Sequence, residues 1–522
     1  MSSELARVAG PLGAAGLVVL LLARKRTYRL AGLVAWAVGL AALADYLRPA
    51  GHVALLGAAA VAGLVLAAAG AALLVRWPWL LALAVLACVP ARIPVSVGST
   101  DANLLVPLYG VVVAAALALA WELLKGDDRS KELGPVALPL AAFVGWSGLS
   151  LAWGTDVRQG AIELLFFYLP FGLIAVSLSR LDWKRNWARV LYGELIVMAL
   201  VFALVGIEQW INRDIFWNPK LLVGNTYAPF FRVNSVFWDP SIYGRFLVVA
   251  ILASLVVALF SRSPRAVIAA LIAIVGMWIG LLFSFSQSSF IALIAGLVVA
   301  TAYAWRWKAL IPLGVAAGVF LIAVAAAPNV RHAVTNHADG GLNRVTSGRS
   351  KLVSNGVKIA IHHPEIGVGI GGFKHAYAKE AGLRGREPSA AASHDTPITV
   401  AAETGIVGVA LFLWLLVAGF LFTFRRAGHD LAGMAALVFG LVLVSIGVHS
   451  LFYNAFFEDP TVWAALGLAA VVSRQPRAPR KLPHTAKLDR EVEAEREQDQ
   501  RVDGRKGDRS RERDVESLPE RG

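Results

Sequence analysis

The sequence predicts an all-α protein that crosses a membrane many times, with about 12–15 transmembrane helices and one long exterior loop. Three observations predict this fold class. Of the 522 residues, 57% are hydrophobic and only 16% are charged, whereas about a quarter of the residues of a soluble domain are charged. The apolar residues gather in runs of about 20, which are long enough to cross the hydrocarbon core. One long polar interval, residues 343–408, interrupts these runs.

Each apolar run predicts one helix. In chain order, the runs are 5–23, 30–47, 53–75, 77–89, 104–124, 135–153, 162–178, 190–210, 242–260, 266–283, 289–305, 309–327, 404–424, 431–451 and 462–472. The run 77–89 is short enough to be re-entrant or interfacial. The first run resembles the apolar part of a signal peptide, but its cations follow it at 24–26 and no cleavage site leads into a soluble domain. We therefore expect a retained helix.

The basic residues indicate the orientation of the chain rather than a nucleic-acid partner. The net charge is +14, and the cations gather in short loops at 24–26, 184–189, 262–265, 306–308 and 425–426. Lys and Arg in short loops mark the cytoplasmic side of a membrane. We expect these loops and the C-terminus in the cytoplasm. The opposite, exterior side then receives 153–160, 212–239, 284–288, 328–396 and 454–460.

Arginines in the exterior loops are the first candidates for a binding site. Arg232 lies in an aromatic loop, and Arg245 lies about one turn inside the helix that follows. Arg344 and Arg349 open the long loop, which continues into an expected amphipathic helix at 350–362 that a proline ends. A guanidinium presents a rigid fork of donors that matches phosphate oxygens. For Arg245, snorkelling to the membrane surface is an equally good explanation.

Two further motifs in the long loop suggest other chemistry. Residues 367–372, GVGIGG, contain the spacing GxGxxG, but they do not follow a buried strand, so we expect no dinucleotide site. We expect a tight turn that lets a ligand approach the backbone. Ser393, His394 and Asp395 are adjacent and therefore cannot converge as a catalytic triad does. His394 alone can exchange a proton near neutral pH, because the unperturbed pKa of histidine is about 6.5.

Ionisable residues inside the apolar runs are candidates because a charge is costly within a bilayer. Glu163, Glu194 and Glu208 could line a polar cavity or pair with a neighbouring helix, and we favour pairing. Cys88 is the only cysteine, which excludes a disulfide within the chain and a metal site built on cysteines.

Four longer motifs follow one another through the second half of the chain. They lie between residues 210 and 422 and read FRVNSVFWDPSIYGRFL, LLFSFSQSSFIALIAG, TSGRSKLVSNGVKIAIHHPEIGVGIGGF and SHDTPITVAAETGIVGVALFL. In this order they resemble the O-antigen ligase and O-antigen polymerase superfamily of bacterial membrane glycosyltransferases. The helices before residue 210 fit this family only in their hydropathy.

The resemblance implies a GT-C-like, inverting glycosyltransferase of the bacterial cytoplasmic membrane with its active site on the exterior face. Such an enzyme moves a glycan from a polyprenyl (undecaprenyl) pyrophosphate carrier to a glycan or lipid acceptor, and it needs no nucleotide sugar, metal or other cofactor. By matching position, the resemblance implies catalytic roles for Arg232, Arg349 and His394. The two arginines would hold the pyrophosphate, and His394 would take the proton of the acceptor hydroxyl.

We expect substrate-binding roles for four more residues: Gln287 and Glu403, which stand at family positions, and Arg245 and Arg344, which lie near or in the exterior loops. Glu403 belongs to a Glu-x-Gly motif that ends at Gly405. Three positions depart from the family pattern: Asp395 replaces the usual Asn, Ser241 stands where Asn is common, and Gln287 replaces an arginine. The last departure removes a phosphate-facing cation, for which Arg245 is the candidate replacement.

We therefore expect N-terminal transmembrane helices at 1–210, a catalytic membrane region resembling O-antigen ligases at 211–473 with its exterior loop at 328–397, and a charged tail at 474–522. The tail has almost no large apolar residues, so we expect it to be disordered in the cytoplasm. A transporter or flippase for polysaccharide or lipid-linked oligosaccharide is the main alternative. Buried charges at the outer surface favour a transferase, and buried charges near the midplane favour a transporter. The sequence leaves the choice between ligase and polymerase open.

Overall fold

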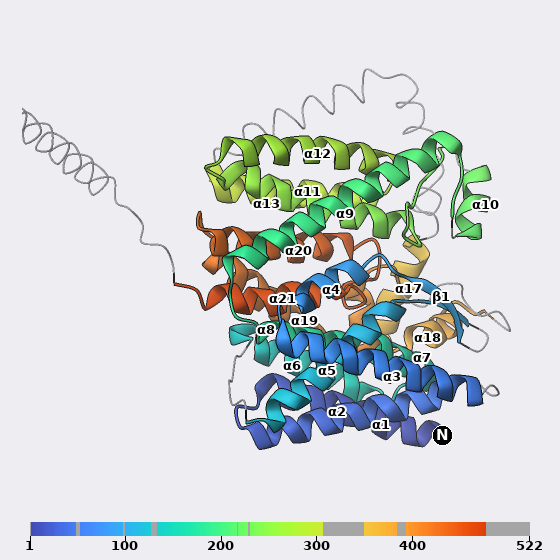
Figure 1. Ribbon diagram of the computed structural model, residues 1–522. Coiled ribbons are helices and arrows are strands. Elements are labelled where there is room, and N and C mark those ends of the chain that lie inside the picture. Colours follow the sequence, from blue (N-terminus) through green and yellow to red (C-terminus); the bar gives the residue numbers. More distant parts are fainter. Residues whose placement is uncertain are drawn as a thin grey trace, which may run out of the picture. The chain divides into compact units, whose positions relative to one another are not determined.

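The chain forms a bundle of long helices that lie side by side with their axes close to parallel (Figure 1). The computed structural model describes residues 2–48, 53–97, 100–126, 133–216, 218–227, 230–305, 349–383 and 393–476. The elements before residue 213 are α1 (Ser3–Leu22), α2 (Arg26–Leu47), α3 (Val53–Arg76), α4 (Leu80–Cys88), β1 (Ile93–Val97), β2 (Thr100–Leu104), α5 (Val106–Leu124), η1 (Gly134–Val136), α6 (Ala137–Ser150), α7 (Val157–Glu163), the π-helical turn η2 (Leu164–Tyr168), α8 (Leu169–Ser179) and α9 (Arg185–Asn212).

The second half contributes both long helices and the short helices of the polar loops. These elements are α10 (Pro219–Tyr227), α11 (Pro240–Phe260), α12 (Pro264–Ser284), α13 (Gln287–Trp305), α17 (Arg349–His362), α18 (Phe373–Glu380), α19 (Thr396–Arg426), α20 (Leu431–His449) and α21 (Pro460–Ser473). The expected helix at 350–362 is thus confirmed as α17. The expected run 309–327 lies outside the described residues.

The helices α11, α12 and α21 begin with the same local pattern. An Asp or Ser side chain accepts a hydrogen bond from a backbone N–H of the first turn, and the next residue is a proline. Asp239 accepts from Ser241 N (2.7 Å), Ser263 accepts from Ala266 N (3.4 Å), and Asp459 accepts from Thr461 N (2.8 Å). Each next residue is a proline, at the start of α11, α12 and α21. The side-chain oxygen satisfies a free N–H of the first turn, and proline fits there because it has no N–H to satisfy. These signals therefore define where each helix enters the bundle.

Small residues let the helices approach one another closely, as in α1 and α2. A Cβ on Gly16 would overlap the backbone of Trp36 and would lie 2.6 Å from the carbonyl oxygen of Gly32. Gly13 and Gly39 meet in the same interface. Lipid tails are as apolar as the side chains, so such close packing, rather than the hydrophobic effect, holds membrane helices together. The first helix packs on α2 and α6 as part of the bundle.

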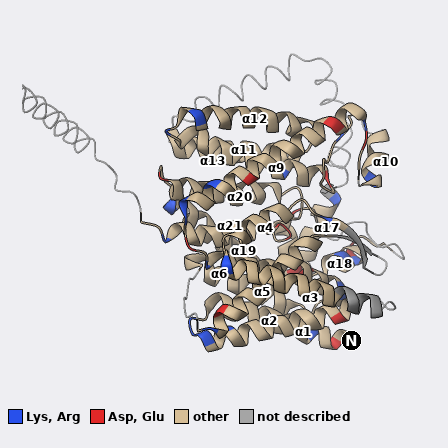
Figure 2. Ribbon diagram, in the orientation of Figure 1, with Lys and Arg blue, Asp and Glu red and all other residues tan. Residues whose placement is uncertain are grey.

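The two ends of the bundle differ in charge (Figure 2). At one end, the cation end, Arg26 donates to Leu124 O (2.7 Å) and Arg180 pairs with Glu122 (3.1 Å). The turns at 23–25, 180–184, 261–263 and 427–430 lie at this end. The opposite end, the loop end, carries α10, α17, α18 and the hairpin of β1 and β2. The described basic loops therefore share one end, and the long polar segments share the other.

The all-α, polytopic fold class is confirmed. Among the described residues, ten helices are long and apolar enough to cross a membrane, and three shorter apolar helices accompany them. The helix α4 has only nine residues, which agrees with the short run expected there. The antiparallel hairpin, in which Ile93 pairs with Leu104, was not expected from the sequence. Helices from both sides of residue 210 pack together within one compact unit, Met1–Gln475.

Candidate functional site

The break in α19 at Gly405 shapes the loop end. Gly405 has φ 65° and ψ −165°, a backbone conformation that is essentially restricted to glycine. The break frees carbonyl groups of the preceding turn, which other segments then use. Three of these carbonyls accept hydrogen bonds, from Val368 N to Ala402 O (2.9 Å), from Gly369 N to Glu403 O (2.8 Å) and from Trp146 Nε1 to Thr404 O (2.9 Å). Just after the break, the N–H of Ile406 donates to Pro364 O (2.8 Å). The long loop is thereby fixed to the bundle.

The glycines at 367–372 make close contact with protein backbone. Gly367, Gly369 and Gly371 all have positive φ. A Cβ on Gly367 would overlap the backbone of Glu403, one on Gly369 would overlap the backbone of Gly154 between α6 and α7, and one on Gly371 would overlap the backbone of Gly160 within α7. The expectation that this turn opens the backbone to a ligand is therefore wrong. The glycines let the loop insert between α19 and the start of α7.

Glu403, predicted to bind substrate, holds the same loop from within the bundle. Its side chain is buried, and its carboxylate accepts a hydrogen bond from Phe373 N (3.2 Å), the first residue of α18. The carboxylates of Glu163, Glu403 and Glu458 border a cavity of about 30 Å³ beneath the loop. This geometry gives Glu403 a positioning role, and contact with substrate stays a prediction.

Ser393, His394 and Asp395 do not form a catalytic triad. The Ser393 hydroxyl donates to Asp395 O (2.7 Å) and lies 2.9 Å from Thr399 Oγ1, while Asp395 Oδ1 accepts from Ile398 N (3.1 Å) and caps α19. Burial raises the pKa of the Asp395 carboxyl. His394 adopts φ 61°, so the backbone turns sharply at this residue. Its two neighbours therefore build the turn that presents the imidazole.

The His394 ring lies near two other aromatic side chains from a different part of the chain. Its centroid is 6.3 Å from that of Tyr453, which in turn is 5.7 Å from that of His449. His449 is fully buried, and its Nε2 lies 3.1 Å from Ser288 Oγ at the start of α13. Ser286 bridges to Ser288 (3.2 Å) within the same turn. Ring contacts therefore connect His394 to His449, and a hydrogen bond connects His449 to the turn between α12 and α13.

Tyr453 also marks a group of charged residues, which we call the polar cluster: Arg92, Asp239, Arg245, Tyr453, Glu458 and Asp459. Burial and the charge of Asp239 raise the Tyr453 pKa, whereas the charges of Arg92 and Arg245 oppose this rise. Burial also raises the pKa of Glu458. The polar cluster lies at the loop end, where α11 and α21 begin, and His394 borders it through Tyr453.

Arg245 neither snorkels nor stands alone. Its side chain is only 3% exposed, and its Nε lies 2.8 Å from Asp459 Oδ2, whose side chain is 6% exposed. The Nη1 atom of Arg245 is buried and makes no hydrogen bond within the described residues. The ion pair ties α11 to α21. The snorkelling explanation is therefore wrong, and binding of substrate by the remaining N–H groups stays a prediction.

Arg232 is held at the same end by the turn between α12 and α13. Its Nε donates to Ser284 O (3.3 Å), and its backbone exchanges two hydrogen bonds with the side chain of Asn225 (2.9 and 3.1 Å). Ser284 also accepts, through its hydroxyl, from Ser286 N (3.2 Å). Arg232 and His449 thus contact the same turn, and a catalytic role for Arg232 stays a prediction.

The remaining predicted site residues are Gln287, Arg349 and Arg344. Gln287 begins α13 and is exposed, whereas the neighbouring serines are buried. Arg349 begins α17, so its backbone lies in the loop that docks on α19. Arg344 lies outside the described residues. Substrate contacts of all three remain predictions.

Sequence reasoning missed several members of this site. Arg92 lies between α4 and β1, where its Nη2 donates to Glu458 O (3.4 Å), and its Nε is buried without a hydrogen bond among the described residues. No local pattern joins two residues that lie 366 positions apart. His449 had a usable signal, since an ionisable residue inside an apolar run is a functional candidate. Asp459 also had a usable signal, because Asp followed by proline is typical of a helix start.

Comparison with protein families gives one match. Residues 272–413 match the family described as O-antigen ligase. We call this matched segment the O-antigen ligase domain. The match confirms the resemblance to the O-antigen ligase and polymerase superfamily, over a shorter segment than the expected 210–422. A comparison with curated proteins finds no match.

The O-antigen ligase domain holds only part of the site. It includes Gln287, Arg349, His394 and Glu403 within its bounds. The polar cluster lies outside these bounds, although Tyr453 places it beside His394. Residues outside the O-antigen ligase domain therefore contribute the charged groups that lie near His394.

Proposed function

We propose that this protein is an inverting membrane glycosyltransferase that moves a glycan from a polyprenyl pyrophosphate carrier to a hydroxyl of an acceptor. One observation carries the proposal: His394 of the O-antigen ligase domain borders a buried cluster containing two arginines at the end of the bundle. A proton acceptor beside fixed cations suits displacement of an anionic leaving group. The family match supports a membrane glycosyltransferase in polysaccharide biosynthesis, and donor and acceptor are part of the proposal.

In the proposed reaction, the acceptor oxygen forms a bond to the anomeric carbon on the face opposite the pyrophosphate. The bond from that carbon to the pyrophosphate oxygen breaks, and the electron pair leaves with the carrier. The acceptor proton passes to the imidazole of His394. Arg232 and Arg349 stabilise the charge that develops on the leaving group, and Arg245, Arg344 and Gln287 contribute to donor binding. No metal takes part in this scheme.

Glu403 has a supporting role in this proposal. Its carboxylate holds the N-terminus of α18, and its backbone holds Gly369. Both contacts fix the loop that follows Arg349. A site held by such contacts keeps its catalytic groups in place when the substrate binds. We place the active site on the exterior face of a bacterial cytoplasmic membrane and the C-terminus in the cytoplasm, because the described basic loops gather at the opposite end from this loop.

The test is transfer from a lipid-linked donor by the full chain in proteoliposomes. We expect His394→Ala and Arg349→Ala to abolish transfer while expression and thermal unfolding stay close to wild type. Losing one such charge-stabilising donor costs about 2.7–4 kcal/mol of transition-state stabilisation, or about 100- to 1,000-fold in rate. The matched controls are His375→Ala on the exposed face of α18 and Lys351→Ala on α17, which should keep activity. Wild-type transfer by both test variants would refute the assignment.

A further inference from the structure

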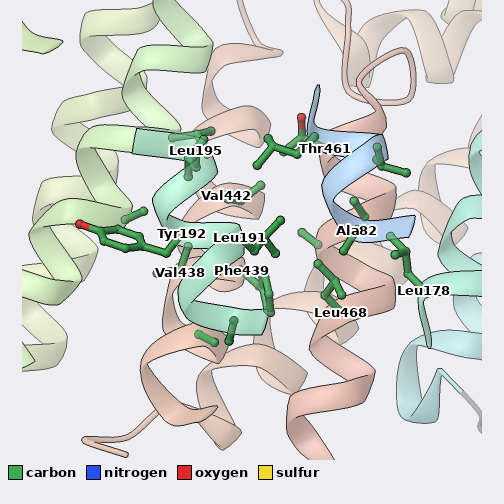
Figure 3. A pocket seen from close by; sticks show the side chains of 18 of the residues that line it. Ala82, Leu178, Leu191, Tyr192, Leu195, Val438, Phe439, Val442, Thr461 and Leu468 are labelled. Atoms are coloured by element: carbon green, nitrogen blue, oxygen red, sulfur yellow. The ribbon is translucent and has the colours of Figure 1, made fainter. Parts of the chain in front are cut away.

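An apolar cavity of about 150 Å³ lies between helices of the bundle (Figure 3). It is lined by residues of α4, α8, α9, α11, α20 and α21 and by Trp183, which lies between α8 and α9. Figure 3 shows Thr461 and Leu195 toward one end and Leu468 and Phe439 toward the other. The lining runs from Thr461 to Leu468 on α21 and from Trp187 to Leu195 on α9, which is about 10–12 Å along each helix, and it reaches Trp183 in the turn at the cation end. Leu86, Leu191 and Tyr192 remain partly exposed along it.

The helices that line this cavity lead into the polar cluster at the loop end. On α11, Val249 and Ala253 line the cavity and continue the face of Arg245, because residues four apart lie above one another on a helix. On α21, Thr461 follows Asp459 by two residues. On α4, Val89 lines the cavity three residues before Arg92. One end of the apolar space therefore lies within about one helical turn of Arg245 and Arg92.

Both arginines have donors left over. Nη1 of Arg245 and Nε of Arg92 are buried and make no hydrogen bond within the described part of the chain. A buried guanidinium N–H without an acceptor is costly, and a phosphate oxygen is a well-matched acceptor for it. The Arg245 charge is already balanced by Asp459, so Arg92 is the better candidate for net attraction.

We propose that this cavity holds the first isoprene units of a polyprenyl diphosphate, whose diphosphate binds Arg92 and the free donor of Arg245. This inference rests on the proposed function and assigns a position to its donor. The occupant needs an apolar chain and an anionic head at one end, which is the arrangement of the lining and the arginines. Lipid competes for an apolar cavity on nearly equal terms. The affinity for the carrier therefore depends on its diphosphate and on how well its isoprene units fit the cavity.

The test measures binding of glycan-free undecaprenyl diphosphate to the full chain in nanodiscs by native mass spectrometry. We expect Arg92→Gln to weaken binding about 10- to 100-fold, as loss of a charged hydrogen bond does, and Arg92→Lys to weaken it less. Ala465→Phe and the smaller Ala82→Leu fill the cavity and should weaken binding about tenfold or more. Ala87→Phe on the exposed face of α4 is the matched control and should bind like wild type.

Two further ligands separate the contribution of the isoprenoid tail to binding from that of the diphosphate. Undecaprenol, which lacks the diphosphate, should respond to Ala465→Phe but not to Arg92→Gln. Dioleoyl phosphatidic acid should bind at least tenfold more weakly than the diphosphate. Equal binding of phosphatidic acid with the same sensitivity to these variants would overturn the assignment to a polyprenyl carrier. Thermal unfolding of each variant shows whether the fold is retained.

The outcomes also separate this inference from the proposed function. If the wild type binds the diphosphate with these sensitivities but transfers no glycan, the proposed transfer fails and the binding site stands. If the wild type transfers glycan while Ala82→Leu, Ala465→Phe and Arg92→Gln bind the diphosphate normally, the binding site fails and the transfer stands.

Discussion

Replacing Gly405 by alanine should release the loop from α19 while leaving the helices folded. Alanine strongly disfavours φ 65° with ψ −165°, and such a conformation costs about 1–3 kcal/mol in a residue other than glycine. The added Cβ would also overlap the backbone of Glu365. If the chain avoids this strain by undocking, it loses the hydrogen bonds made by Val368 N, Gly369 N and Ile406 N. At about 0.5–1.5 kcal/mol each, these three bonds amount to about 1.5–4.5 kcal/mol.

The smaller of these two costs sets the expected effect, because the variant takes the cheaper route. We therefore expect the docked state to lose about 1–3 kcal/mol, which is about 5- to 150-fold in the population of the undocked state. Hydrogen exchange measured by mass spectrometry over residues 364–373 reports this population directly. Peptides from α1, α2 and α11 should exchange as in wild type.

Gly110 provides the control, since it is an exposed glycine inside α5 with no atom close to its added Cβ. Gly110→Ala should leave exchange at 364–373 unchanged and stabilise the helix by about 0.5–1 kcal/mol. If Gly405→Ala keeps wild-type protection at 364–373 as well as wild-type transfer, the docking role derived for Gly405 is refuted.

Three other substitutions test the packing and the ion pairs. Asp459→Ala should destabilise the protein by about 3–5 kcal/mol, because it leaves the buried charge of Arg245 without its partner. Asp430→Asn should cost about 1–3 kcal/mol at neutral pH, because it removes a carboxylate that accepts two hydrogen bonds from buried Arg426. The Arg426 hydrogen bonds lower the Asp430 pKa, so this stabilisation is present above the unfolded pKa, about 3.9, and is lost as the pH falls through the folded pKa. Gly16→Leu should cost about 1–3 kcal/mol or more by forcing α1 from α2. Thermal unfolding measures all three.

Each of these has a result that contradicts it. Asp459→Ala with a wild-type melting temperature would mean that the ion pair adds nothing to stability. A deficit of Asp430→Asn that grows rather than shrinks in acid would contradict the sign of the pKa shift. For Gly16→Leu the control is Gly63→Leu, since nothing lies near the added Cβ of Gly63. Equal melting temperatures of the two leucine variants would contradict the close packing of α1 and α2.

The helices could be predicted because their signals are local. A run of apolar residues identifies a membrane helix wherever it packs, and Asp239 or Asp459 before proline marks a helix start without help from distant residues. The break at Gly405 could not be predicted in this way. Nothing in a short apolar context separates a glycine with positive φ from one that packs against a neighbouring helix, such as Gly16.

The candidate site residues that the sequence offered lie in local motifs, and the residues that it missed come together only when the helices pack. His394 follows from its loop position, but its neighbours Tyr453 and His449 come from the far end of α20 and become visible only once the helices are packed. Glu403 was predicted to bind substrate because it matches the Glu-x-Gly motif of the family that the sequence resembles. In the structure its carboxylate accepts a hydrogen bond from the first backbone N–H of α18. A glutamate with this structural role looks the same in the sequence as one that binds substrate.

The distribution of buried charge bears on the choice between a transferase and a transporter. A transporter is expected to place charged groups near the midplane, where its substrate crosses. Among the described residues, the ion pair with both partners buried, Arg245 with Asp459, lies at the loop end beside His394. Glu194 lies deeper, nine residues into α9, or about 14 Å along the helix. One carboxylate at that depth does not form a pathway, whereas two arginines, a histidine and a tyrosine gather at the loop end, which is the distribution expected of the proposed transferase.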